Sequence, residues 1–353
     1  MKISRLPVIS LFTGAGGLDI GLEQAGFTIS VCVESDKDRC KTIELNRPDW
    51  RVINRDIRKV STKEILETAQ LRVGEAALLS AGPPCQPFSK SAFWAKGSRV
   101  VKSDLRTRLL SECVRVIAEA RPGGYLIENV RGLAYRTASA TLEALTSRLE
   151  REGYSYSWAV LNAADYSVPQ KRERIFILGA KDGSRMPLPE PTRSRGSYVT
   201  AGDAIGDLDD GVVKDDEMVR GKWGHLLSSV PPGGNYLHLK KMRGGRRQPF
   251  KRRSRYWSFL LKLSPDKPSW TIQATPGTFT GPFHWNNRRL RIPELKRLQT
   301  FPDDWLFYGG NSSVMAQIGD AVPPLLAREI GKAVVAKLAG ITTPLQTAAS
   351  VPK

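Results

Sequence analysis

The chain has 353 residues, of which 41% are hydrophobic and 25% are charged, as in an ordinary globular protein with room for two domains. No run of about 18 apolar residues and no export signal is visible, so we expect a cytoplasmic protein rather than one that spans a membrane. The net charge of +19 favours a polyanionic partner. Four cysteines and three histidines show no zinc-like spacing, so no metal site is expected.

The first half of the chain alternates strand-like apolar runs with helix-like segments. In chain order, the predicted strands are 7–11, 28–33, 51–54, 76–81, 125–128, 157–161 and 175–178, and the predicted helices between them are 18–25, 37–45, 62–70, 105–120 and 138–151. Such alternation predicts an α/β fold with a doubly wound, mostly parallel sheet that has helices on both faces. Beyond Asp182 the periodicity weakens, and helical patterns return only at 292–299 and 324–338.

The irregular region is strongly basic. Between Met218 and Pro265 it has twelve Lys and Arg residues, interleaved with aromatic ones, and no Asp or Glu. Because solvated charged surfaces normally mix both signs, this segment predicts contact with nucleic acid. Its candidate DNA-binding residues are Lys240, Lys241, Arg243, Arg246, Arg247, Lys251, Arg252, Arg253 and Arg255.

A glycine-rich turn joins the first predicted strand to the first helix, and its glycines allow a ligand to approach the backbone. Glu34 ends the second strand, where an acid can bind ribose hydroxyls, and Asp56 follows the third. A dinucleotide fingerprint would have glycine in place of Asp19, and a carboxylate is unfavourable beside phosphate. The pattern therefore favours S-adenosylmethionine over a nicotinamide cofactor, and a plain turn is the simplest alternative. The glycines are Gly14, Gly16 and Gly17.

A loop stiffened by prolines follows the fourth strand and carries Cys85. Glu128 lies at the end of the fifth strand, and ligands of parallel sheets bind beyond the carboxyl ends of the strands, so thiol, carboxyl group and methyl donor are expected to converge. This combination suggests methylation of cytosine: a thiolate adds to C6, the carboxyl group assists at N3, and C5 becomes nucleophilic. The alternative is a buried, inert cysteine.

Six motifs in order resemble those of the DNA cytosine-5 methyltransferase family of bacterial restriction–modification systems. They cover 12–17, 82–89, 128–130, 170–174, 289–305 and 317–323. The resemblance implies a Rossmann-like catalytic domain over 1–185, a target-recognition domain over 186–290, a hinge over 291–312, a C-terminal helical segment over 313–341 that completes the catalytic domain, and a flexible tail over 342–353.

The resemblance also implies residue roles. Cys85 would be the nucleophile, Glu128 the partner of N3, Arg174 the contact to the base carbonyl, and Arg172 the holder of a phosphate near the target base. Phe12 would pack on adenine, Glu34 would bind ribose, Asp56 the adenine amino group, and Pro84 would line the pocket. The family has Asn where this chain has Asp320, which can accept from the cofactor's amino group but cannot donate. Further implied DNA contacts are Ser89, Ser91 and Gln170.

These features predict an enzyme that methylates C5 of a flipped-out cytosine in double-stranded DNA and releases S-adenosyl-L-homocysteine. We expect a monomer that protects DNA from a cognate restriction endonuclease. Three alternatives remain open at this point: an RNA methyltransferase acting on tRNA, an inactive DNA-binding module, and a nicotinamide dehydrogenase.

Overall fold

A computed structural model of the chain describes residues 6–84, 105–135, 138–240, 250 and 256–338, with only the backbone for 105–107 and 240. Cys85 lies outside the described residues. So do the predicted DNA contacts Ser89, Ser91, Lys241, Arg243, Arg246, Arg247, Lys251, Arg252, Arg253 and Arg255, together with the side chain of Lys240. In the described part of the chain, no helix is both long and apolar enough to cross a membrane.

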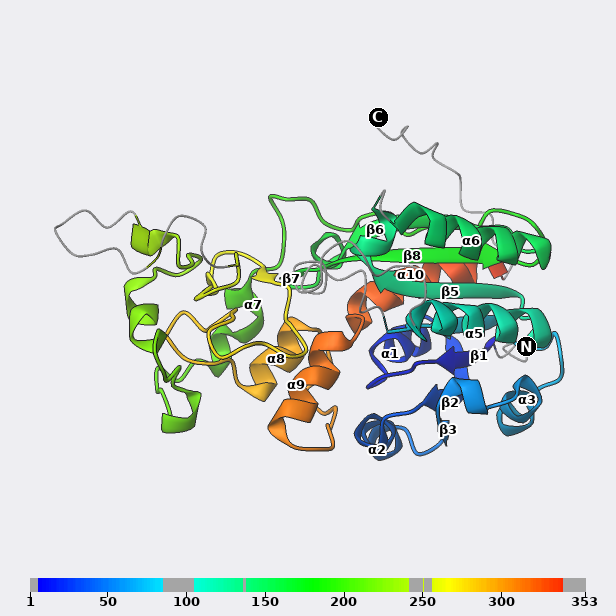
Figure 1. Ribbon diagram of the computed structural model, residues 1–353, viewed down its shortest axis with the longest axis horizontal. Coiled ribbons are helices and arrows are strands. Elements are labelled where there is room, and N and C mark those ends of the chain that lie inside the picture. Colours follow the sequence, from blue (N-terminus) through cyan, green and yellow to red (C-terminus); the bar gives the residue numbers. More distant parts are fainter. Residues whose placement is uncertain (1–5, 85–104, 136–137, 241–249, 251–255, 339–353) are drawn as a thin grey trace.

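A seven-stranded sheet forms the centre of the molecule, in the order β3-β2-β1-β4-β5-β8-β6 (Figure 1). Strands β1 to β5 are parallel, and β8 runs antiparallel to both of its neighbours. This arrangement confirms the predicted α/β class and the mostly parallel sheet. The strands are β1 (Leu6–Leu11), β2 (Phe27–Glu34), β3 (Arg51–Asn54), β4 (Leu78–Ala81), β5 (Gly124–Val130), β6 (Ser157–Asn162) and β8 (Glu173–Ala180).

Helices cover both faces of the sheet because successive strand residues point to opposite sides. In β1, Ile9 packs with α3, α5 and α6 on one face, whereas Val8 packs with α1, α2 and α10 on the other. Two buried cores therefore enclose the sheet, as the alternating sequence predicts. The helices are α1 (Gly17–Gln24), α2 (Lys37–Asn46), α3 (Thr62–Ala69), α5 (Leu105–Ala120), α6 (Ser139–Arg151) and α10 (Pro324–Leu338).

Helix α10, near the end of the chain, packs against α1, near its start (Figure 1). Small residues permit this close approach. A Cβ added to Gly21 would lie 2.4 Å from Cβ of Ala327, and one added to Gly331 would lie 2.6 Å from Cβ of Ala25. The central sheet is thus covered in part by a helix that begins more than 140 residues beyond the last strand of the sheet in the sequence.

The remainder of the chain extends to one side of the sheet and has little regular structure (Figure 1). A cluster of aromatic rings, among them Tyr236, Phe250 and Phe259, forms its own small core. A two-stranded parallel pair links it to the segment that precedes β8. The elements are the pair β7 (Gln170–Lys171) and β9 (Ser269–Trp270) and the helices α7 (Ala201–Ile205), α8 (Ile292–Leu298) and α9 (Asn311–Asp320), with short 3-10 segments between them.

Candidate active site

The candidate site lies where the strand order reverses. Strand β1 pairs with β2 on one side and with β4 on the other, so the chain turns in opposite directions as it leaves these central strands. Open α/β sheets bind their ligands in the crevice at such a point. The glycine-rich turn follows β1, and Gly82, Pro83 and Pro84 follow β4, so both predicted segments reach this crevice.

The glycine-rich turn is fixed to the end of β2. The backbone N–H of Phe12 donates to the Val33 carbonyl at 2.8 Å, and that of Gly14 donates to Oε2 of Glu34 at 2.9 Å. Gly14 and Gly16 have φ values of +61° and +84°, which side chains with a Cβ rarely adopt. Glycine is therefore required at these positions to bring the turn beside Glu34.

Backbone N–H groups hold the Glu34 carboxylate in place. Its Oε1 accepts from the N–H groups of Ser35 (2.8 Å) and Asp36 (2.9 Å), and its side chain is largely buried. Oε2 accepts one bond, from Gly14, and keeps acceptor capacity toward the crevice. An oriented carboxylate with an acceptor to spare suits a ribose diol.

Asp56 lies at the same edge of the sheet as Glu34, because Asn54 at the end of β3 is the register partner of Glu34. Its carboxylate accepts from the Arg58 N–H at 3.0 Å and from Arg58 Nε at 2.9 Å. Hydrogen bonding to the Arg58 side chain lowers the pKa of Asp56. The structure therefore places Asp56 near the predicted adenosine contacts, but its carboxylate is already hydrogen-bonded to Arg58.

Glu128 meets both loops at the crevice. A Cβ added to Gly82 would lie 3.7 Å from Oε2 of Glu128 and 3.8 Å from the carbonyl oxygen of Phe12. Oε1 of Glu128 pairs with Nε of Arg174 at 3.1 Å. Burial raises the pKa of Glu128, although Arg174 and Arg172 oppose the shift. A carboxyl group that retains its proton more readily than usual can serve as a proton donor.

Asn129 anchors the loop that leads to Cys85. Its buried Nδ2 donates to the Pro83 carbonyl at 3.3 Å, and the Gly82 N–H donates to the Leu11 carbonyl at 3.3 Å. Pro84, the next residue, is exposed and directly precedes Cys85. Sequence reasoning gave Asn129 no role, although its place beside Glu128 was a usable signal.

Two predicted contacts with DNA are buried instead. Arg172 is fully buried and donates to the carbonyl groups of Gly319 (2.8 Å) and Asp320 (3.2 Å). Gln170 is also fully buried, donates to the Leu298 carbonyl and accepts from the Ile272 N–H. Neither side chain is exposed in this structure, and a phosphate contact of Arg172 and a DNA contact of Gln170 stay predictions. The two side chains connect the start of β8 to the C-terminal segments.

Asp320 ends α9 and faces the glycine-rich turn through an ion pair with Arg39 of α2 (2.7 Å). Sequence reasoning missed Arg39. The groups around the crevice fit S-adenosylmethionine: a turn that leaves the backbone open, an oriented carboxylate for ribose, an aromatic ring in Phe12 and a charged pair at the far end.

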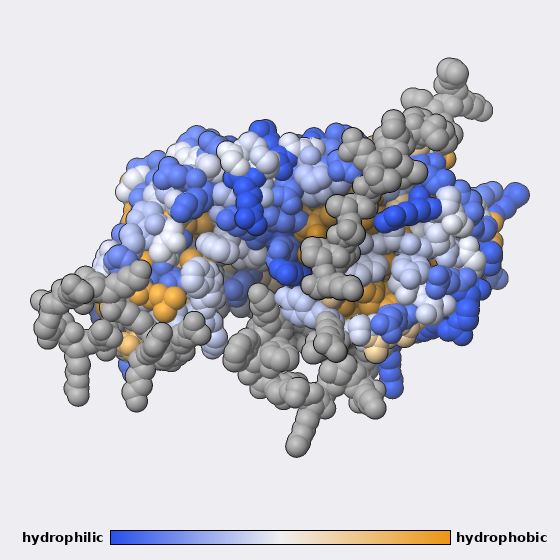
Figure 2. Space-filling model, turned by 90° about the horizontal axis from the view of Figure 1, so that it is seen from above, coloured by the Kyte–Doolittle hydropathy of each residue, from blue (hydrophilic) through white to orange (hydrophobic). Residues whose placement is uncertain are grey.

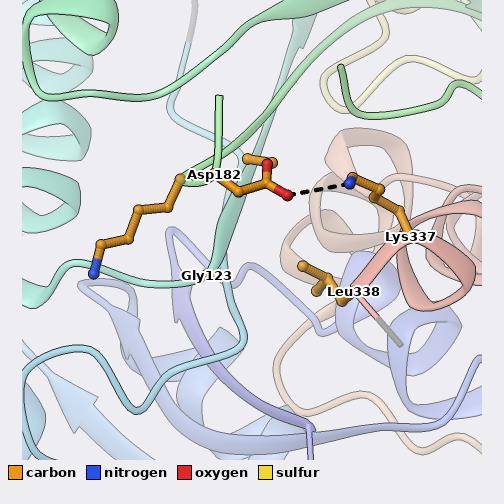
Figure 3. A pocket seen from close by; sticks show the side chains of 6 residues that line it. Gly123, Asp182, Lys337 and Leu338 are labelled. Atoms are coloured by element: carbon orange, nitrogen blue, oxygen red, sulfur yellow. Dashed lines mark hydrogen bonds and ion pairs between the residues drawn. The ribbon is translucent and has the colours of Figure 1, made fainter. Parts of the chain in front are cut away.

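A separate hollow of about 340 Å³ lies on the opposite edge of the sheet (Figure 3). Gly123 precedes β5 and Ala180 ends β8, so the hollow opens at the amino end of β5, away from Glu128. Lys337 of α10 closes one side through an ion pair with Asp182 at 3.1 Å. This hollow therefore has no part in the candidate site.

Known proteins resemble this chain over nearly its whole length. Residues 6–336 match the model of the family described as C-5 cytosine-specific DNA methylase. The Type II methyltransferase M.SacI of Streptomyces achromogenes is 40% identical, with 97% of each chain covered. The Type II methyltransferase M1.HphI of Haemophilus parahaemolyticus is 35% identical over 94% of this chain and 87% of its own.

Solved structures agree on the fold. A candidate DNA modification methyltransferase encoded within an E. coli prophage superposes with a TM-score of 0.69 at 23% identity, covering 95% of this chain and 99% of its own. The S. pombe Dnmt2 methyltransferase superposes with a TM-score of 0.65 at 16% identity, with 95% and 99% covered. With the match over residues 6–336 and the relatives above, these findings show that the chain is a DNA (cytosine-5-)-methyltransferase and belongs to the C-5 cytosine-specific DNA methylase family.

Proposed function

We propose that this enzyme transfers a methyl group from S-adenosylmethionine to C5 of a cytosine flipped out of a specific double-stranded DNA sequence, through a covalent bond between Cys85 and C6. The observation that carries the proposal is the meeting of Phe12, Gly82 and Glu128 at the switch point of the sheet. Cys85 stands three residues after Gly82, on a loop anchored by Asn129.

In the proposed mechanism, the Cys85 thiolate forms a bond to C6, and the electron pair of the C5–C6 double bond moves toward C4 and N3. Glu128 holds a proton at N3 and so stabilises the adduct, which its raised pKa favours. Arg174 orients Glu128 and reaches toward the base carbonyl. S-adenosylmethionine, when bound, supplies an electrophilic methyl group to C5. Loss of the C5 proton to a base then expels the thiolate and restores the C5–C6 double bond, and the N3 proton returns to Glu128.

The cofactor would lie along the glycine-rich turn. We assign the ribose to Glu34, the adenine ring to Phe12 and the adenine amino group to Asp56, with Pro84 lining the pocket. Gly14 would admit the cofactor to the backbone, because the nearest described atom to an added Cβ there is Nη1 of Arg39 at 3.8 Å. Gly16 and Gly17 stay predicted cofactor contacts through their backbone; an added Cβ there would instead meet Trp305 at 3.3 Å and the Val322 carbonyl oxygen at 2.5 Å.

Exposed aromatic rings beside the basic segment support a DNA surface. Tyr256 and Trp257 are 69% and 54% exposed and directly follow the predicted contacts at 240–255, and Trp257 packs against Trp270. Lys171 lies over the Trp270 ring at 5.4 Å. Aromatic rings with lysine and arginine suit unstacked bases and phosphates. The described surface seen from above is mostly hydrophilic, which agrees with a polar partner (Figure 2).

The relatives named above are Type II methyltransferases from bacteria. We therefore propose that this enzyme acts in the cytoplasm, as a monomer, and protects DNA from a cognate restriction endonuclease. We retain the predicted division into catalytic domain (1–185 and 313–341), recognition domain (186–290), hinge (291–312) and tail as part of this proposal.

A DNA duplex that contains 5-fluorocytosine tests the chemistry, because fluorine at C5 cannot leave as a proton does and the adduct is trapped. First, bisulfite sequencing of DNA from cells that express the enzyme identifies the target site. With that duplex and S-adenosylmethionine, the wild type should form a band that survives denaturing electrophoresis, and Cys85→Ser should form none while still binding DNA. Methylation by Cys85→Ser above background would contradict the mechanism, and methylation of tRNA instead of DNA would contradict the substrate.

Glu128→Gln should lower the rate constant of the trapping step by about 10²-fold or more, because the amide cannot hold the proton at N3. Glu173→Gln is the matched control: it is a nearby, exposed acid that pairs with Arg131. A similar loss in both variants would show that Glu128 has no special role.

A further inference from the structure

Arg39 and Asp320 form an ion pair across the mouth of the glycine-rich turn. Arg39 lies in the first turn of α2 and Asp320 ends α9, and their atoms Nη2 and Oδ2 are 2.7 Å apart. Nη1 of Arg39 is the nearest described atom to a Cβ added to Gly14, at 3.8 Å. The pair therefore borders the same crevice as the proposed ribose contact.

The charges around the pair connect the two ends of the site. Burial lowers the pKa of Arg39, but Asp320 and Glu34 more than offset this and raise it. On the other side, the charge of Asp320 adds to the rise in the pKa of Glu128. Asp320 thus lies within electrostatic reach of the catalytic carboxyl group, and Arg39 within reach of the ribose acid. With the ribose at Glu34 and the reacting methyl group near Glu128, as proposed above, the amino-acid end of the cofactor would lie near this pair.

That end of S-adenosylmethionine carries one ammonium group and one carboxylate. A carboxylate alone at position 320 would attract the first and repel the second. The guanidinium of Arg39 offers planar donors that match a carboxylate. We propose, on the basis of the function proposed above, that Arg39 binds the carboxylate of the cofactor's amino-acid end, beside the ammonium group that Asp320 is already expected to bind.

The competing explanation is an ordinary surface ion pair that joins α2 to α9. The two side chains are 23% and 51% exposed, and exposed pairs contribute only about 0–1 kcal/mol to stability. Such a pair would influence every ligand equally, or none, because it would act only through the position of the helices.

Three ligands separate the two explanations by calorimetry. S-adenosylhomocysteine carries both charged groups, its decarboxylated form S-adenosyl-3-thiopropylamine carries the ammonium group only, and 5′-methylthioadenosine carries neither; all three are thioethers without a sulfonium charge. Arg39→Gln should weaken binding of the first by about 10-fold or more and leave the other two within about twofold, since charge-assisted hydrogen bonds contribute about 1.5–3 kcal/mol. Asp320→Ala should weaken the binding of the two ligands that carry the ammonium group and leave the binding of 5′-methylthioadenosine unchanged.

The control is Lys41→Gln, which removes an exposed ion pair with Glu44 from the same helix and should change no affinity. If either variant weakens all three ligands equally, or changes none, the inference is wrong while the proposed function stands. If the wild type binds none of the three, the proposed cofactor is wrong as well. Arg39→Lys keeps the charge but loses the planar donors, so its affinity for S-adenosylhomocysteine should lie between those of the wild type and Arg39→Gln. If Arg39→Gln does not fold, Arg39→Lys should still bind S-adenosylhomocysteine more weakly than the wild type.

Discussion

Asp19 should make the stability of the enzyme fall as the pH rises. This acid lies in the first turn of α1 and is fully buried. Its Oδ1 accepts a long hydrogen bond from Ser80 (3.4 Å), and its Oδ2 has no hydrogen-bond partner among the described residues. Burial raises its pKa from an ordinary 3.8 to about 7. The folded state therefore keeps a proton that the unfolded state releases, and stability present below pH 3.8 is lost as the pH rises toward 7.

The size of the effect follows from the two pKa values. The interval from 3.8 to about 7 corresponds to about 4 kcal/mol, at about 1.36 kcal/mol per unit. About 2.5 kcal/mol of this loss of stability falls between pH 5 and pH 8, where unfolding can be measured. Asp19→Asn cannot ionise, so its free energy of unfolding should lack this loss.

Urea unfolding at several pH values between 5 and 8 measures the effect. The difference in unfolding free energy between Asp19→Asn and wild type should rise in favour of the variant by about 2.5 kcal/mol across this range. Other titrating groups cancel in the difference. Asp216→Asn, at an exposed position, should show a flat difference. A flat difference for Asp19→Asn as well would refute the reasoning.

Three further measurements test the packing and the charge of the molecule. Gly21→Ala would bring its Cβ to 2.4 Å from Cβ of Ala327 and should lower stability by about 3 kcal/mol or more in urea unfolding, whereas Gly196→Ala, which meets no atom within 4 Å, should not. Arg288→Met removes the two hydrogen bonds that the buried Glu294 accepts from Arg288, although the bond from the Arg291 N–H remains, and should cost about 3–5 kcal/mol; adding Glu294→Gln should recover much of this, and no recovery would exclude charge burial as the cause. DNA affinity should fall steeply with salt concentration, and a flat response in a filter-binding titration would contradict a basic DNA surface.

Much of the sheet and its helices could be predicted from sequence because the local signals agree with the fold. The bounds predicted for 51–54, 105–120 and 324–338 coincide with β3, α5 and α10. The helical segment expected over 313–341 covers most of α9, but the periodicity did not mark α9 as a separate helix. Half of its residues are polar, and Gln317 is buried through hydrogen bonds with Tyr308, nine residues away, and with Thr42, from a distant part of the chain. A periodicity of apolar residues cannot reveal burial of that kind.

In the candidate site, too, some features could be predicted from the sequence and others could not. The convergence of the glycine-rich turn, the loop before Cys85 and Glu128 follows from strand order, so the sequence could predict it. The burial of Arg172 could not be predicted, because four consecutive charged residues at 171–174 are typical of an exposed strand. Only the folded chain places the carbonyl groups of Gly319 and Asp320 beside that guanidinium. Likewise, Arg39 carries no local mark of its pairing with a residue 281 positions away.

The packing of α10 on α1 has a consequence for how the enzyme is made. A ribosome that has synthesised all of β1 to β8 still holds a chain without the helix that covers Gly21, and without Asp320 at the mouth of the turn. The apolar side of α1 stays open to solvent until α10 has emerged from the exit tunnel. Newly made molecules should therefore gain the ability to modify DNA only once α10 has packed on α1, all at once rather than in stages.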